Sequence, residues 1–570
     1  MTSRPSPRWI APRTPDADMS RVLAGTLAIP DRVAALLVQR GYADPDVAKR
    51  FLRPRLEQLH DATTMAGLAT AVDRLARAVR NGERIMIHGD YDVDGICSTT
   101  LMLRTLRLLG ADAVPFIPHR LTDGYDLSDA GVRKAIEIGA RVVVTCDCGT
   151  SALEAIDALH RAGIDVVISD HHLPKSALPT PLALLNPRRP DCEYPDKDLA
   201  AVGVAFKLAL ALTREMKASD APVWKMLDLV ALATVADVAP LRGENRVFVR
   251  YGLRMLAETE NVGLRALLRA SGMDGKTLTA GRIGFTLAPR LNAAGRLGHA
   301  LRGVDLLTTD SEHEANAIAR ELEELNRTRQ GLDRATLDEA RTIAAARVRD
   351  DGAYGLVIAK DGWHAGVIGI VASRIVEEFA RPAVLVALEG DTGKGSGRSI
   401  SAFDLHAALG ECSDLLLRYG GHRAAAGVTV SAERVGDFAR RFDEVARARL
   451  TEEDLRPELR IDAEIPLAAA TAELESVLRH FEPFGVGNPS PTFAARNVSP
   501  VTAPRLIGKD GVRVRLIGDG AELDAIGWGM AHMAPLMAPG RRLDVAFRLE
   551  RDEYQGESRL QARLADVIPR

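Results

Sequence analysis

Residues 84–95 read RIMIHGDYDVDG, a short apolar run that ends in a dense group of acids beside a histidine. The run is typical of a buried strand, and the polar residues follow its carboxyl end. Carboxylates placed this close repel one another unless protons or cations neutralise them. Carboxylate together with neutral imidazole suits Mn²⁺ or Zn²⁺ better than Ca²⁺. The stretch therefore predicts a strand of an α/β sheet with a metal site at its end.

Three more apolar runs follow the first one. They lie at 113–118, 141–146 and 165–169, each ahead of residues with helical periodicity. Their spacing is that of a strand, a crossover helix and a returning strand, which predicts a parallel sheet wrapped by helices.

Acidic and imidazole side chains stand at the ends of these runs, at 88–94, at Asp147 and at 170–172. Open parallel sheets bind ligands beyond the carboxyl ends of their strands, so we expect these groups to converge. A single carboxylate at a strand end is usually a helix N-cap, and that alternative covers Asp147 or Asp170 taken alone. It does not cover the whole set. Two divalent ions about 3.5–4 Å apart, held by such a set, can activate water and stabilise both oxygens of a phosphoryl displacement.

The texture of the sequence changes along the chain. Apolar residues recur at helical spacing over 311–348, which predicts a long connecting helix. A second, smaller α/β pattern with glycine-rich segments covers 349–450, and short alternating strands over 451–570 predict a small β-barrel. We expect an N-terminal segment at 1–60, packed on the core, and a catalytic domain at 61–310.

Length, composition and charge limit the classes of protein to which this chain can belong. At roughly 150 residues per domain, 570 residues suggest three or four domains, and 46% hydrophobic with 26% charged residues is ordinary for soluble proteins. The net charge of −3 argues against gripping nucleic acid by bulk charge, although a local basic groove stays open. No signal peptide or membrane span is expected, and the cysteine spacing, without a CxxC pair, fits a reducing cytoplasm. No GxSxG elbow or GxxxxGK[ST] loop occurs, so acyl transfer and the commonest route to ATP use lack support.

Four motifs together resemble the DHH phosphoesterase family in order and spacing. They are DYDVDG at 90–95, VTCDCG at 144–149, DHH at 170–172 and ATVAD at 233–237. Three further motifs resemble the associated DHHA1 domain: DGWHAGVIGIVASR at 361–374, GSGRS at 395–399 and GGH at 420–422. PRLNAAGR at 289–296 and FEPFGVGNP at 481–489 narrow the resemblance to the bacterial RecJ branch of the family.

This resemblance implies an α/β fold with a parallel-sheet DHH domain, a DHHA1 domain and a C-terminal OB-type barrel. It implies a 5′-to-3′ exonuclease that uses Mn²⁺ or Mg²⁺ and degrades single-stranded DNA to 5′-mononucleotides in repair and recombination. Implied partners are single-stranded DNA, a helicase and a single-strand-binding protein. We expect a cytoplasmic monomer without a membrane association.

The resemblance also implies roles for individual residues. It places one ion on His88, Asp92 and Asp147, and the other on Asp94, Asp147, His171 and Asp237. Asp90, Asp170 and His172 would orient those ligands, although a buried histidine of the core also explains His172. A pocket for a terminal 5′-phosphate would contain Arg120, Ser396 and Arg398, for which a glycine-rich turn with a surface arginine is the alternative.

The strand path implied by the resemblance runs along Tyr125, Arg290, Asn292, Arg296 and His422. Arg505, Arg513 and Arg515 would follow phosphates across the barrel, as OB folds do, but a solvated strand face explains them almost as well. Aromatic residues total only 4%, so extensive base stacking is not expected.

Two other functions stay open. A DHH-family phosphodiesterase could act on short oligonucleotides, cyclic dinucleotides or polyphosphate with the same two ions. The barrel argues against it, because a small substrate needs no extended groove. A non-catalytic single-strand-binding subunit is the second alternative, and the full set of acids and imidazoles argues against that one.

Overall fold

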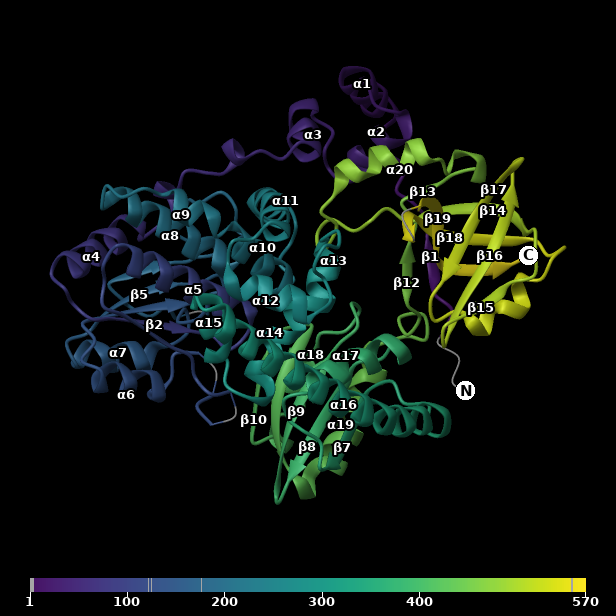
Figure 1. Cartoon of the computed structure of the whole chain (residues 1–570). Coiled ribbons are helices and arrows are strands. Elements are labelled where there is room, and N and C mark those ends of the chain that lie inside the picture. The colour runs from purple at the N-terminus through teal and green to yellow at the C-terminus, as the bar shows by residue number, and fades with distance from the viewer. Residues whose placement is uncertain (1–4, 121, 125, 176, 555–556) are drawn as a thin grey trace.

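The computed structural model describes residues 5–120, 122–124, 126–175, 177–554 and 557–570. The chain forms three units, each built on its own large sheet (Figure 1). The first unit lies at the left of Figure 1, the second at the bottom and the third at the right, with the N-terminal helices across the top. Among the described residues, no helix is both long and apolar enough to cross a bilayer.

The first unit contains the predicted parallel sheet, with strand order β3-β2-β4-β5-β6. Its strands are β2 (Ile85–Gly89), β3 (Ala113–Phe116), β4 (Val142–Cys146), β5 (Asp165–Ser169) and β6 (Ala183–Leu185). All neighbouring strands pair in parallel. The register sets Gly89 opposite Cys146, and Cys146 opposite Ser169. The acids that follow these residues therefore leave the sheet at one edge.

Helices cover both faces of this sheet, which explains why its strands are continuously apolar. Side chains on the face of Ile87 and Val144 share a core with α4 (Leu68–Arg80), α5 (Val93–Leu108) and α8 (Ala201–Glu215). The opposite face, with Met86 and Val143, packs on α6 (Asp129–Glu137) and α7 (Leu153–Arg161).

A helical extension follows α8 and joins the first core. It comprises α9 (Ala221–Lys225), α10 (Leu227–Ala236), α11 (Gly243–Ala257), α12 (Val262–Ala270), α13 (Ala280–Arg282), the π-helical turn η3 (Ile283–Leu287), α14 (Ala288–Leu297) and α15 (Leu301–Thr308). Helix α10 is apolar and buried almost all round, as expected for a helix that crosses a core. Its C-cap is Asp237, which is thereby delivered to the edge of the sheet.

The expected long helix is α16 (Glu312–Asp350), capped by the Ser311 side chain, which accepts a hydrogen bond from the Glu314 amide. It leads to the second unit, whose sheet has the order β10-β11-β9-β8-β7. The elements are β7 (Leu356–Asp361), α17 (Ile368–Phe379), β8 (Ala383–Glu389), β9 (Thr392–Arg398), α18 (Leu405–Gly410), β10 (Arg418–Gly421), β11 (Ala425–Ser431) and α19 (Val435–Arg449). Only β7 and β8 pair in parallel; the other neighbours are antiparallel.

The third unit is the predicted β-barrel. Its strands are β13 (Ala463–Glu464), β14 (Phe493–Pro500), β15 (Arg505–Ile507), β16 (Gly511–Gly518), β17 (Ala521–Gly527), β18 (Leu543–Tyr554) and β19 (Glu557–Pro569), and α20 (Ala472–Leu478) precedes β14. An additional pairing of β14 with β16 closes the sheet on itself.

The N-terminal segment shares its core with this barrel. Its elements are α1 (Ala17–Leu27), α2 (Asp31–Gln39) and α3 (Pro45–Leu52), and β1 (Arg8–Ile10) pairs with β12 (Glu458–Arg460). Leu37 and Phe51 belong to the same apolar cluster as Phe481 and Phe547. We expected residues 1–60 to pack on the core, and the core that they share is that of the barrel.

Arg246 of α11 connects the first unit to the N-terminal segment and to the chain that leads into the barrel. Its buried guanidinium donates to the backbone carbonyl oxygens of Phe51, His480, Phe481, Glu482 and Pro483, at 2.8–3.5 Å. It also lies 4.0 Å from the centre of the Phe51 ring. One arginine therefore binds both the N-terminal segment and the chain that leads into the barrel.

Candidate active site

The loop after β2 places two carboxylates at the start of α5. Asp92 is the N-cap, and its Oδ1 accepts from the amides of Asp94 and Gly95 at 2.9 and 3.1 Å. Asp94 is buried and accepts from the amides of Ala201 and Val202, both at 2.9 Å. The N-terminus of α8 thus points at the Asp94 carboxylate and favours its charged form.

The ends of β4 and β5 supply the next groups. Asp147 adopts a left-handed φ of 67°, and its amide donates to the Ser169 carbonyl at 2.9 Å. Nε2 of His171 lies 3.3 Å from Oδ1 of Asp147 and 3.7 Å from Oδ2 of Asp237. The ends of β4, β5 and α10 therefore meet, as the sequence predicted for strand ends.

Asp170 holds the two histidines in place. Its Oδ1 accepts from the His171 amide at 2.7 Å and lies 2.8 Å from Nδ1 of His172. Its Oδ2 accepts from the Thr150 amide at 3.0 Å. Although burial opposes both charges, the contact with His172 lowers the pKa of Asp170, and Asp170 raises the pKa of His172 to about 9. The two side chains therefore form an ion pair at neutral pH, with Asp170 buried and His172 about half-exposed.

The side chains at this edge form three overlapping sets whose ligand atoms lie within 4.8 Å of one another. The sets are Asp90, Asp92 and Asp147; Asp147, His171 and His172; and Asp94, His171 and Asp237. Because Asp147 and His171 each belong to two sets, the sets form one continuous group, which we call the acid cluster. Its members come from positions 90 to 237 of the chain.

The acid cluster fits divalent cations. Burial, assisted by Asp92, raises the pKa of Asp94 to about 7, and burial raises the pKa of Asp237 to about 7. Burial and the charges of Asp94 and Asp92 raise the pKa of Asp147 well above its ordinary value. Among the described residues no hydrogen bond reaches Oδ1 of Asp90 or of Asp147, although both atoms are buried. Bound cations would satisfy these oxygens and neutralise the charge, and oxygen-rich sites with imidazole suit Mn²⁺ and also Mg²⁺.

His88 is not a member of the three sets, and its predicted ligand role stays a prediction. Its ring lies 5.3 Å from the Phe116 ring, and its Nδ1 is 3.5 Å from Sγ of Cys148. A Cβ added to Gly131 of α6 would lie only 2.7 Å from its Nε2. Side chains alternate along a strand, so His88 points to the face of Met86, which α6 covers. Asp90, expected only to orient ligands, stands in the acid cluster instead.

Two of the three residues predicted to bind a terminal 5′-phosphate touch one another. Nη1 of Arg398 donates to Oγ of Ser396 at 3.0 Å. A Cβ added to Gly369, near the start of α17, would meet Oγ of Ser396 at 2.9 Å and Nη2 of Arg398 at 3.2 Å. The guanidinium of Arg120 lies 4.7 Å from the centre of the Tyr91 ring. Burial and then the charge of Arg120 lower the pKa of Arg398, so the two arginines lie near enough for their charges to interact.

The described residues predicted for the strand path lie in three places: on α14, after β10 and in the barrel. On α14, Nη1 of Arg296 donates to the Gly366 carbonyl at 2.8 Å, Arg290 pairs with Glu323 at 2.6 Å, and Asn292 is half-buried. His422 is exposed just after β10. In the barrel, Arg505 is exposed, Arg513 pairs with Asp552 at 3.3 Å and Arg515 with Asp524 at 2.8 Å. Tyr125 lies outside the described residues.

Sequence reasoning missed a buried polar group on α16. Nη1 of Arg329 lies 3.1 Å from Asp333, which also lies 3.5 Å from Arg374 of α17. Asn326, Arg329 and Asp333 interrupt a buried stripe that otherwise holds Leu322 and Leu337. That interruption was a signal in the sequence, because an apolar stripe rarely carries polar residues without a partner across the interface.

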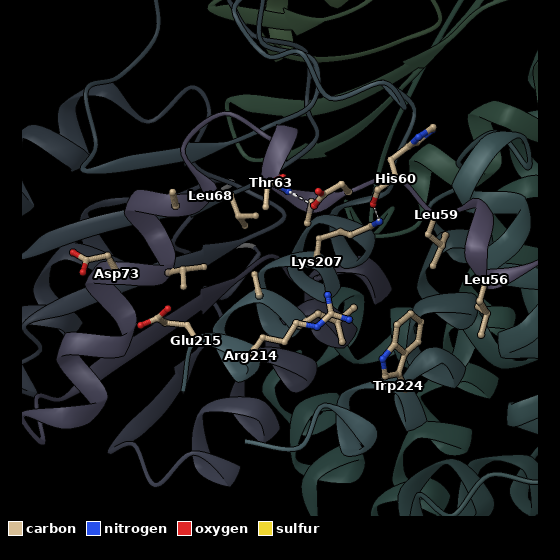
Figure 2. Close-up of a pocket in the computed structure, with 16 residues that line it drawn as sticks. Leu56, Leu59, His60, Thr63, Leu68, Asp73, Lys207, Arg214, Glu215 and Trp224 are labelled. Carbon is tan, nitrogen blue, oxygen red and sulfur yellow. Dashed lines mark hydrogen bonds between the residues drawn. The ribbon is translucent and has the colours of Figure 1, made fainter. Parts of the chain in front are cut away.

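A cavity of about 930 Å³ lies elsewhere on the first unit (Figure 2). The segment 56–63 and helices α4, α8 and α9 line it. Nζ of Lys207 donates there to the His60 carbonyl at 2.7 Å, and Arg214 and Trp224 form part of the wall (Figure 2). No residue that the sequence predicted for the site lines this cavity, so the acid cluster alone carries the predicted chemistry.

Comparisons with known proteins agree with this geometry. Family models match the DHH family N-terminal domain at 84–234, the DHHA1 domain at 350–448 and the RecJ OB domain at 461–566. The chain is similar to the single-stranded-DNA-specific exonuclease RecJ of Bacillus subtilis, with 38% identity over 98% of this chain and 70% of that protein. The protein of the same name from Dickeya dadantii is 36% identical over 95% of this chain and 97% of its own.

Among solved structures, RecJ of Thermus thermophilus in complex with Mn²⁺ superimposes with a TM-score of 0.84 at 34% identity, covering 98% of this chain and 79% of that one. The three units, their order and the full-length similarity point to one family. The chain belongs to the RecJ family of single-stranded-DNA-specific exonucleases.

Proposed function

We propose that this protein is a metal-dependent exonuclease that degrades single-stranded DNA from the 5′ end to 5′-mononucleotides. The observation that carries the proposal is the acid cluster at the edge of the parallel sheet, together with the cations Arg398 and Arg120 and the hydroxyl of Ser396; Arg120 packs on Tyr91, which lies between Asp90 and Asp92 of the cluster. The cluster supplies the chemistry of phosphodiester cleavage, and the two cations with the hydroxyl supply recognition of an end. The names of the relatives support the substrate.

Two divalent cations, Mn²⁺ or Mg²⁺, would be held by the acid cluster. Asp90, Asp92 and Asp147 would bind one, and Asp94, His171 and Asp237 the other, with Asp147 beside both. Such a pair of ions supplies Lewis-acid stabilisation and an activated water. The Thermus thermophilus RecJ structure is a complex with Mn²⁺, which supports this choice of ion.

The protein groups around the cluster act by fixing its ligands. The amides of Ala201 and Val202 fix the position of the Asp94 carboxylate and partly offset the effect of burial on its pKa, and Asp170 positions His171 through the backbone amide. Burial lowers the pKa of His171, which keeps its imidazole neutral and able to offer a lone pair. These contacts preorganise the cluster before substrate arrives.

End recognition follows from Arg120, Ser396 and Arg398. A terminal phosphate offers more charge and more free oxygens than a diester, and two guanidinium groups with a hydroxyl can saturate them. A 5′-phosphate bound there would leave the first diester at the acid cluster, so single nucleotides would be released.

The division into a segment at 1–60, a catalytic domain at 61–310, a helix at 311–348, a DHHA1 domain at 349–450 and an OB domain at 451–570 is part of the same proposal. Association with a helicase and a single-strand-binding protein, and action as a monomer, belong to it as well.

The proposal is tested with three substrates of equal length: a linear single strand, a covalently closed circular single strand and a blunt duplex. With Mn²⁺ the linear strand should be reduced to mononucleotides, while the circle and the duplex persist. EDTA should stop the reaction. Cleavage of the circle would show an endonuclease, and activity confined to di- to pentanucleotides would favour the small-substrate phosphodiesterase.

A further inference from the structure

Phe285 is 89% exposed, more than any other large apolar residue that the structure describes. It lies in the π-helical turn Ile283–Leu287, whose end residues Ile283 and Leu287 are fully buried in the core of the first unit. The turn is therefore anchored on one side and presents Phe285 on the other. Single π-helical turns are rare and occur frequently at functional sites.

The turn lies beside the acid cluster. It packs on α10, where a Cβ added to Gly284 would be 3.5 Å from Cγ1 of Val235, two residues before Asp237. It continues directly into α14, and Arg290 of that helix donates to the Thr286 carbonyl. In Figure 1, α13, which precedes the turn, lies on the side of the first unit that faces the barrel.

Three other exposed apolar residues lie on segments that adjoin the acid cluster or are bonded to the chain that follows it. Leu173 follows His172 directly and is 71% exposed, and Val238 follows Asp237 and is 61% exposed. Val238 has a φ of 61°, a strained value for a β-branched residue, and such strain is concentrated at functional sites. Val486, in the chain that leads to the barrel, accepts at its carbonyl from the Leu241 amide at 2.8 Å.

Scattered exposed apolar residues need no explanation, but these stand on separate segments around one cluster of acids. An occupant that combines apolar faces with negative charge fits this surface, because the exposed Arg282 comes directly before the turn and, among the described residues, its guanidinium donates only to the Thr277 carbonyl. A single strand of DNA has both, since its bases are unpaired and its phosphates follow the same course. A duplex hides its base faces within the stack.

We propose that Phe285 stacks on a base of the strand that approaches the acid cluster, with Val238 and Leu173 in contact with its neighbours. This inference rests on the proposed function and assigns to one side chain part of the preference for single strands. Stacking of this kind tolerates any base, because every base has a π-face. Phe285 is then a positioning residue that holds the strand in line between the barrel and the cluster.

The test compares Phe285→Ala, Phe285→Trp and the control Leu108→Ala. Leu108 is also exposed and apolar, at 52%, but it ends α5, whose first turn carries Asp94. Binding is measured in EDTA by fluorescence anisotropy, with one single strand carrying all its bases and one carrying abasic residues over the first eight positions. All variants change exposed side chains, and unaltered thermal unfolding checks that each is folded.

Loss of one stacked base should weaken binding of the normal strand by roughly 5- to 150-fold in Phe285→Ala. Binding of the abasic strand should be nearly unchanged by that substitution. Phe285→Trp should restore affinity for the normal strand, and Leu108→Ala should bind both strands as wild type does. Equal losses on both strands, or no loss on either, would overturn the inference. A change in oligomeric state of Phe285→Ala in sedimentation would also overturn it, because the surface would then be an interface between copies.

The same preparations distinguish this inference from the proposed function. Failure of the wild type to hydrolyse a linear single strand with Mn²⁺ would contradict the function itself. Hydrolysis by the wild type, together with undiminished binding by Phe285→Ala, would contradict only the role of Phe285.

Discussion

Replacing Asp147 with asparagine should stabilise the protein in the absence of divalent cations. The substitution keeps the shape of a buried side chain but removes a carboxyl whose charged form is disfavoured by burial and by Asp94 and Asp92. Oxygens of Asp92 and Asp147 lie within 4.8 Å of each other, and two like charges at that separation repel by roughly 3–4 kcal/mol or more at an effective dielectric constant of about 20. Because partial protonation relieves part of that repulsion, we expect a gain of about 1–3 kcal/mol, or roughly 2–10 °C for a unit of 150–250 residues.

With Mn²⁺ present, Asp147→Asn should instead be less stable than wild type. Cations that bind only the folded protein raise its melting temperature, and Asp147 takes part in two of the three ligand sets. The melting temperature of the wild type should therefore rise markedly on addition of Mn²⁺, whereas that of Asp147→Asn should rise little. Hydrolysis should fall by more than about 100-fold, since changing residues that merely orient metal ligands already costs about 10- to 100-fold.

Asp170→Asn is the matched control, because it is the same substitution in the same pocket. The pKa of Asp170 is lowered by its contacts with His172, so the carboxylate stabilises the folded protein at neutral pH. Removing it takes the nearest partner from the half-exposed His172 cation and a charged acceptor from the amides of His171 and Thr150, so we expect a loss of about 1–3 kcal/mol without cations. Differential scanning calorimetry at pH 7.5, with EDTA or Mn²⁺, measures both variants. Destabilisation of Asp147→Asn in EDTA, or a full response of that variant to Mn²⁺, would refute the reasoning.

Three further predictions concern other parts of the molecule. Arg398→Ala should reduce kcat/KM on 5′-phosphorylated strands by about tenfold or more, as expected for one lost charged contact, and affect 5′-hydroxyl strands much less; an equal loss on both would remove Arg398 from end recognition. Arg246→Met removes the hydrogen bonds of one guanidinium to five carbonyl oxygens, two of which keep a bond from Asn488. Binding to long strands should therefore weaken and its salt dependence flatten, while hydrolysis of trinucleotides continues; an unchanged salt slope would contradict this. Without cations the stability should fall as pH rises from about 5 to 8, because the folded pKa values of Asp94 and Asp237, near 7, exceed their unfolded values; denaturant titrations that show rising stability would count against it.

The sequence predicted the sheet and most of the acid cluster because both depend on local pattern. Apolar runs that end in acids at regular spacing specify parallel strands with a shared edge, and the register of β2, β4 and β5 brings those ends together. The predicted ligand role of His88 stays a prediction, because it was based on the position of His88 at the strand end. Because side chains alternate along a strand, His88 shares a face with Met86, and its ring lies under α6.

Other features depend on contacts between distant segments and left little trace in the sequence. The amides of Ala201 and Val202 hold Asp94 across more than a hundred residues, without a capping side chain on α8. The packing of the N-terminal helices on the barrel depends on apolar residues that could serve any core. Only the polar stripe of Asn326, Arg329 and Asp333 on α16 was readable in advance.

The central claim is that the acid cluster cleaves single strands one nucleotide at a time from the 5′ end. Time courses with a long single strand labelled at either its 5′ or its 3′ end, with Mn²⁺ and with EDTA, test it most directly. We expect the 5′ label to appear at once as mononucleotide, while the 3′ label remains on progressively shorter strands, and no reaction in EDTA. Immediate release of the 3′ label as mononucleotide, or hydrolysis that persists in EDTA, would contradict the account.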